Sequence, residues 1–175
     1  TACILLPIGL GVGFFAEGIV TMVFGQGFVY AVLPLQILIV GAVIFGIACK
    51  SIGGSLSSIN RLDLTLKVTS LGAIINIILN ILLIPYLGIF GAAIATTVSL
   101  ILMSFIFVRL TIKVLLIKIH FKWFAQIIGI AIIAIFFFVI GNEFINTYVL
   151  GFSILIIYIV LIFNFFLMNE DKSPP

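Results

Sequence analysis

Residues 76–99 read NIILNILLIPYLGIFGAAIATTVS, and this stretch decides the fold. One apolar run leads up to Pro85, and a second apolar run begins directly after Gly88. Proline stops helices, and glycine permits a tight reversal of the backbone. Each run continues outward far enough to cross a hydrocarbon layer of about 30 Å, which needs about 20 helical residues. The stretch therefore predicts two membrane helices joined by a short turn.

The composition of the whole chain agrees with this prediction. Of 175 residues, 65% are apolar and 7% are charged, whereas about 25% are charged in an ordinary soluble domain. The mean hydropathy is +1.54. So few charged side chains cannot form the polar shell of a soluble core, which excludes a soluble enzyme, a nucleic-acid-binding domain and a disordered tail. We therefore predict an all-α membrane protein that crosses the bilayer several times and has no nucleic-acid partner.

Apolar runs between helix-breaking or polar residues predict six transmembrane helices. We expect them at about Ala2–Phe24, Val29–Ile59, Leu64–Ile84, Ile89–Leu115, Trp123–Ile140 and Thr147–Met168. The first four carry small and polar residues at helical spacing, as packed membrane helices do, whereas the last two are rich in Ile and Phe almost all round. We therefore expect a four-helix packed core in residues 1–115, a basic interfacial linker at 116–122, a peripheral transmembrane hairpin at 123–168 and a polar cytoplasmic tail at 169–175.

Basic residues gather on one side of this predicted membrane. The connections near Gln26, Pro85 and Glu143 contain no Lys or Arg, whereas the two other connections are basic. By the positive-inside rule the basic side is cytoplasmic, which places the C-terminus in the cytoplasm. Basic side chains at this level also attract anionic membrane lipids. The cytoplasmic basic residues are Arg61, Lys67, Arg109, Lys113, Lys118 and Lys122.

Polar residues inside the predicted helices are candidates for a substrate cavity. Gln36, Lys50 and Ser57 are separated by multiples of seven residues and share one face of the second helix. Lys50 lies about 15 Å from the inner end of that helix at 1.5 Å per residue. It either lines a water-filled cavity and attracts a phosphate or pyrophosphate, or reaches the cytoplasmic headgroups. Asn76 and Asn80 either contact a substrate or form hydrogen bonds between helices.

Glu17 is the candidate for binding a coupling ion. Its carboxylate lies about two turns from the outer end of the first helix, where it either carries a proton or a cation or reaches interfacial water. The chain has two cysteines, Cys3 and Cys49, and a single histidine, His120, without metal-ligand spacing. Neither a phosphate-binding loop nor a catalytic motif is present, so we expect no metal, no cofactor and no enzymatic activity.

The first 110 or so residues contain an ordered series of short motifs. A Phe-Gly turn is followed by a short basic loop, two asparagines four residues apart, a Leu-Ile-Pro segment, a turn glycine and a helix start rich in small residues. These elements are Phe24-Gly25, Asn60-Arg61, Asn76 and Asn80, Leu83-Ile84-Pro85, Gly88, and Gly91-Ala92-Ala93-Ile94-Ala95-Thr96. In this order they resemble the C-terminal half of polysaccharide and O-antigen flippases of the multidrug/oligosaccharidyl-lipid/polysaccharide exporter superfamily.

The resemblance implies a two-lobe exporter of 12–14 helices, of which this chain would supply the last six. The first predicted helix begins at about Ala2, so we expect a missing N-terminal lobe as partner. The implied substrate is a polyprenyl-pyrophosphate-linked oligosaccharide, moved across the cytoplasmic membrane of a prokaryote by alternating access for polysaccharide biosynthesis. The alternatives are a multidrug or toxin exporter of the same superfamily, a membrane-embedded polysaccharide polymerase, and a scaffold subunit.

Overall fold

The computed structural model describes residues 2–49, 62–115, 129 and 151–160, and every element there is helical. In order these are α1 (Ala2–Phe14), α2 (Ala16–Phe24), the 3-10 helix η1 (Gln26–Ala31), α3 (Val32–Ile47), α5 (Leu62–Leu87) and α6 (Ile89–Leu115). A shorter apolar helix follows at Gly151–Val160. The described part therefore agrees with the all-α prediction.

Within the described residues, three helical segments are long and apolar enough to cross a membrane, and there is a fourth if α1 and α2 form one bent span. The three are Gln26–Ile47, Leu62–Leu87 and Ile89–Val114. The predicted span at 89–115 coincides with α6. The predicted spans at 123–140 and 147–168 fall mostly outside the described residues, so the count of six stays a prediction.

The first predicted span is not a straight helix. The axes of α1 and α2 differ by 66°, and the break is at Phe15. Backbone hydrogen bonds continue on both sides, from Phe15 N–H to Gly11 O at 3.0 Å and from Ile19 N–H to Phe15 O at 2.8 Å. Glycines at 9, 11, 13 and 18 surround the break. Glycine costs about 0.5–1 kcal/mol in a helix relative to alanine, so this segment bends easily.

The third predicted span was expected to end at Pro85, and this is wrong. α5 continues through Pro85 to Leu87, and the reversal occurs at Gly88, whose φ is 54°. Proline in the last turn removes a single backbone donor, whereas the left-handed conformation at position 88 suits glycine. Gly88 N–H donates to Ile84 O at 2.8 Å and closes the helix.

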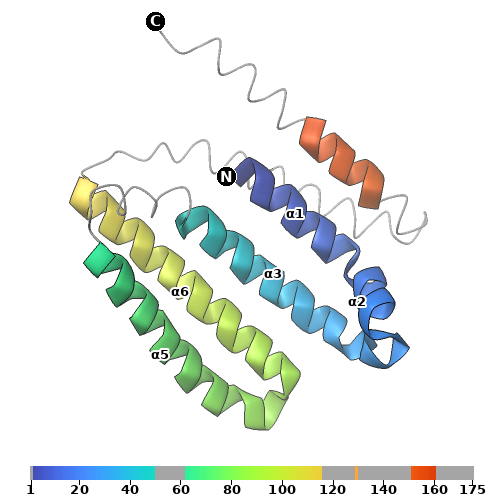
Figure 1. Cartoon of the computed structure of the whole chain (residues 1–175), viewed down its shortest axis with the longest axis horizontal. Helices are drawn as coiled ribbons and strands as arrows, with labels where there is room; N and C mark the ends of the chain where they lie inside the picture. Colours follow the sequence, from blue (N-terminus) through green and yellow to red (C-terminus); the bar gives the residue numbers. More distant parts are fainter. Residues whose placement is uncertain (1, 50–61, 116–128, 130–150, 161–175) are drawn as a thin grey trace, which may run out of the picture.

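The long helices lie side by side in the order α5, α6, α3 and α1, as an open row (Figure 1). The helix Gly151–Val160 lies beside α1, where Tyr158 packs against Leu10. A row leaves two broad faces instead of one enclosed core. The expected four-helix core is therefore a single layer of helices in the described part of the chain.

Glycines allow close approach at each seam between neighbouring helices. A methyl group placed on Gly41 of α3 would lie 2.9 Å from Thr97 Cα of α6. One placed on Gly46 would lie 2.8 Å from Leu5 Cδ1 at the α1–α3 seam, and one on Gly72 would overlap Met103 at the α5–α6 seam. Small residues of this kind let membrane helices approach until their backbones touch.

We expect Gly41→Ala to destabilise the helix row. The new methyl group meets the backbone of Thr97, which cannot rotate away, so the cost should be that of overpacking, about 1–3 kcal/mol. Thermal unfolding of the purified protein in detergent measures the loss. Gly27→Ala is the matched control, because no atom lies within 4 Å of a methyl group at that position. Equal unfolding temperatures for the two variants would contradict the close contact.

Candidate functional site

One side-chain hydrogen bond joins α3 to α1. Gln36 Nε2 donates to the backbone oxygen of Gly13 at 3.0 Å. Gly13 lies in the last turn of α1, where helix carbonyls lack an intrahelical donor. The Gln36 amide therefore satisfies an acceptor that the bend at Phe15 exposes.

The other two seams each have a comparable bond. Thr97 Oγ1 of α6 donates to Ile37 O of α3 at 2.9 Å. Asn76 Nδ2 of α5 donates to Thr96 Oγ1 of α6 at 3.3 Å. Every neighbouring pair in the row is thus joined by a polar side chain as well as by a close glycine contact.

Three of the predicted cavity residues can be placed. Gln36 lies at the α1–α3 seam, and Asn76 lies at the α5–α6 seam together with Asn80. The structure therefore distributes them over separate seams of the row. Lys50 and Ser57 lie outside the described residues. The cavity role of these five residues stays a prediction.

Sequence spacing did not single out Thr97, although it forms the α3–α6 bond and its side chain is buried. Helical spacing groups the small residues near the start of this helix on one face, which consists of Gly88, Gly91, Ala92, Ala95, Thr96 and Ser99. Thr97 lies 100° from Thr96 around the helix and so belongs to another face. The sequence feature that could have indicated this contact is Gly41 on α3. It identifies Thr97 as its partner only once α3 and α6 are packed together.

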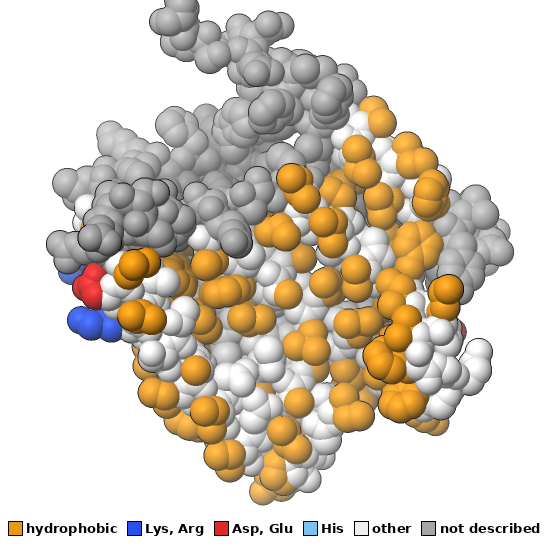
Figure 2. Space-filling model, viewed as in Figure 1, with side chains coloured by type: hydrophobic (Ala, Val, Ile, Leu, Met, Phe, Trp, Pro, Cys, Tyr) orange, Lys and Arg blue, Asp and Glu red, His pale blue; other side chains and the backbone are white. Residues whose placement is uncertain are grey.

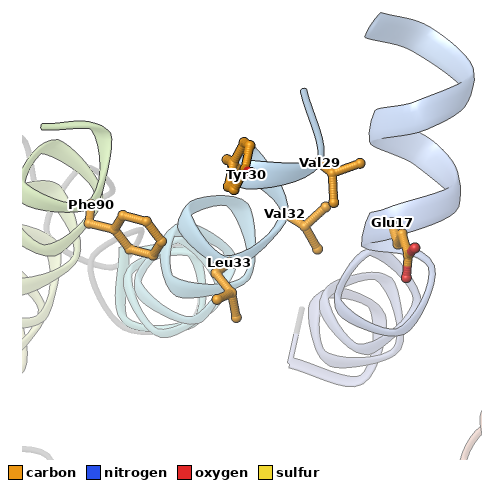
Figure 3. A pocket seen from close by; sticks show the side chains of 6 residues that line it. All are labelled: Glu17, Val29, Tyr30, Val32, Leu33 and Phe90. Carbon is orange, nitrogen blue, oxygen red and sulfur yellow. The ribbon is translucent and has the colours of Figure 1, made fainter. Parts of the chain in front are cut away.

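Glu17 lies at the edge of a pocket of about 340 Å³ (Figure 3). The close-up shows Tyr30 on η1 and Phe90 on α6, with the start of α3 between them. Val29, Val32 and Leu33 complete the lining. Glu17 and the two aromatic rings line this pocket from different sides, and a carboxylate and the face of a ring each attract cations. Within residues 2–49, 62–115 and 151–160, however, no group of three His, Cys, Asp or Glu side chains could hold a metal ion.

Cationic side chains gather at one end of the row. Asp63 and Lys67 lie in the first two turns of α5, and Arg109 and Lys113 lie in the last two turns of α6. Figure 2 shows charged side chains at this edge and hydrophobic side chains over the helices. The Arg109 guanidinium lies 4.6 Å from the centre of the Phe105 ring. Among the described residues the remaining charge is Glu17 at the far end, whereas Arg61, Lys118 and Lys122 lie outside them.

Two archaeal proteins are similar to this chain. A probable low-salt glycan biosynthesis flippase, Agl15, of Haloferax volcanii is 35% identical over 96 residues, which is 55% of this chain and 20% of the flippase. An uncharacterized membrane protein of Methanocaldococcus jannaschii is 32% identical over 172 residues, which is 95% of this chain and 34% of that protein. The chain thus spans between a fifth and a third of the length of these relatives. No family profile matches it, and no solved structure matches it significantly. The long apolar helices and these relatives identify a multi-pass membrane protein.

Removing the α3–α6 hydrogen bond should weaken the row. We expect Thr97→Val to cost about 0.6 kcal/mol and at most about 1.7 kcal/mol, the range measured for such bonds in membranes. Thr69→Val is the matched control, because the Thr69 hydroxyl bonds its own helix, to Thr65 O at 2.9 Å. Unfolding in detergent compares them. A larger loss for Thr69→Val would contradict the role given to Thr97.

The charge distribution predicts the orientation in the membrane. In full-length protein without Cys3 and Cys49, we expect Lys113→Cys to react with an impermeant maleimide only after the cytoplasmic side is exposed. Tyr86→Cys, at the opposite end of the row, should react in intact cells. The reason is the preference of basic side chains for the cytoplasmic side. Labelling of Lys113→Cys in intact cells would reverse this topology.

Proposed function

We propose that this chain is the C-terminal part of a flippase that moves a polyprenyl-pyrophosphate-linked oligosaccharide across the cytoplasmic membrane. The observation that carries the proposal is the 35% identity to a protein named as a glycan biosynthesis flippase. The described part also supports a transporter. Its helices are long and apolar, and the polar side chains of Gln36 and Asn76 lie between neighbouring helices. The protein would move its substrate across the membrane without cleaving a bond.

Alternating access would use the helix row as one rigid unit. Transporters of this kind rock one helix bundle against another around a central site. Close glycine contacts and one hydrogen bond per seam suit α1, α3, α6 and α5 to moving together. The second bundle would be the missing N-terminal lobe.

The proposed cavity would bind the substrate through its negatively charged pyrophosphate. Lys50 would attract the pyrophosphate, because a cation away from bulk water binds an anion strongly. Gln36 and Ser57 would share its face of the helix. Glu17 would exchange a proton or a cation with the outer side during the cycle.

A multidrug exporter of the same superfamily is the second candidate. The pocket at Glu17 favours it, because one carboxylate with Tyr30 and Phe90 suits an organic cation. A transport assay with both kinds of substrate separates the two functions.

We expect Lys50→Gln to slow translocation of a lipid-linked oligosaccharide by full-length protein in proteoliposomes. Loss of a hydrogen bond to a charged group corresponds to about a tenfold to hundredfold effect. Lys67→Gln is the matched control, since Lys67 is exposed at the charged end of α5. Unchanged translocation by Lys50→Gln would reject the cavity role. Transport of tetraphenylphosphonium instead of the glycolipid would favour the multidrug function.

A further inference from the structure

Asn76 and Asn80 form a pair in the sequence, but their side chains make hydrogen bonds to different partners. Asn76 reaches α6 through Thr96. Asn80 Nδ2 donates to Asn76 O and to Asn76 Oδ1, both at 2.9 Å. Within the described residues, Asn80 makes no hydrogen bond to another helix. Asn76 therefore joins two helices, whereas Asn80 does not.

The side chain of Asn80 retains one hydrogen-bond acceptor that the described residues do not use. A side-chain amide has two N–H donors and one oxygen acceptor. Both hydrogen bonds of Asn80 Nδ2 go to Asn76. Its Oδ1 atom stays available as an acceptor, and Asn76 holds the orientation of that atom. The pair thus presents a fixed acceptor next to the second N–H of the Asn76 amide.

These amides belong to one flank of α5. At 100° per residue, Thr65, Thr69, Asn76 and Asn80 fall within an arc of about 60°. All four are half-buried. We call this set the polar flank. Across the helix, Ile74 and Ile78 are 54% and 51% exposed, as expected for side chains that face lipid.

The depth of Asn80 makes an unused acceptor costly. It lies seven residues before Leu87, or about 10 Å from the outer end of α5. A polar group in hydrocarbon without a hydrogen bond is unfavourable, so such groups face protein, water or a ligand. The polar flank meets α6 at Asn76, through Thr96. Asn80 Oδ1 accepts no hydrogen bond from the described residues, so this atom is the one that needs water or a ligand, whereas the isoleucine side faces lipid.

We infer that Asn80 Oδ1 accepts a hydrogen bond from a sugar hydroxyl of the transported lipid, with Asn76 as the residue that positions it. This inference rests on the proposed function. A carbohydrate carries neighbouring hydroxyls, each a donor and an acceptor, and these match the Asn80 oxygen and the remaining Asn76 N–H. A neutral amide pair would select the sugar and leave the pyrophosphate to a cation elsewhere.

The binding experiment uses full-length parent protein in detergent and two synthetic probes. One is polyprenyl-pyrophosphate-linked N-acetylglucosamine, and the other is the same polyprenyl pyrophosphate without sugar. Asn80→Leu should bind the sugar-bearing lipid about three- to tenfold more weakly, the effect of one hydrogen bond. Its affinity for the sugar-free lipid should not change. Its unfolding temperature should fall less than that of Asn76→Leu, because Asn80→Leu loses two bonds within α5 but no bond to another helix. Asn76→Leu should lower both the affinity for the sugar-bearing lipid and the unfolding temperature, because it also loses the bond to Thr96.

The outcomes separate this inference from the proposed function. If the unaltered protein binds neither lipid, the proposed function fails, and the inference fails with it. If it binds both and Asn80→Leu binds the sugar-bearing lipid equally well, the inference fails and the proposed function stands. An equal loss of affinity for both probes also overturns it, because the sugar is then not what Asn80 contacts.

A labelling experiment tests the flank without relying on the affinity. In full-length protein without Cys3 and Cys49, Asn80→Cys should react with a water-soluble maleimide faster than Ile78→Cys. The two positions have nearly the same depth and lie on opposite sides of α5, and thiolate forms only where water reaches. Saturating sugar-bearing lipid should slow the reaction at position 80. Equal rates at the two positions, or no protection by the lipid, would overturn the inference.

Discussion

This structure depends on close contact between helices in a medium where the hydrophobic effect does not drive helices together. Lipid tails are as apolar as leucine, so membrane helices associate through van der Waals contact and hydrogen bonds. Each seam of the row meets both needs. The α3–α6 seam shows it most clearly, because Gly41 touches the backbone of Thr97 and the Thr97 hydroxyl bonds Ile37 O one turn away. The glycine brings the backbones together, and this proximity makes the hydrogen bond possible.

The two sides of α5, the last helix of the row, differ in polarity, and charges distinguish the two ends of the row. On α5 the polar flank with Asn76 and Asn80 adjoins the α6 seam, whereas Ile74 and Ile78 lie on the other side. Along the helix axes, Lys67 and Lys113 lie at one end and Glu17 at the other. Side chains thus distinguish the two sides of α5 and the two ends of the row.

Sequence reasoning predicted the hairpin because Pro85 and Gly88 interrupt long apolar runs, and α6 has the predicted bounds. It placed the helix end at Pro85 and not at Gly88. Proline in a last turn destabilises a helix little, whereas the left-handed conformation at position 88 favours glycine. Helical spacing placed Gln36 on one face with Lys50 and Ser57, and this grouping stays a prediction because the last two lie outside the described residues. It could not assign the partners of Gln36 and the asparagines, because spacing shows which residues share a face but not which helix that face meets. The bond from Thr97 to Ile37 exists only after docking.

The bend at Phe15 and the α1–α3 seam depend on each other. Glycines such as Gly9 let α1 approach Val43 of α3, and the same glycines weaken the helix that contains them. Because α1 ends at Phe14, the Gly13 carbonyl is free to accept the Gln36 amide. A straight α1–α2 helix would direct that carbonyl to the N–H of Glu17, four residues later, and Gln36 would then share the acceptor with this N–H. The conformation of the bent helix and the hydrogen bond to its neighbour are therefore energetically coupled, and movement of either α2 or α3 changes both.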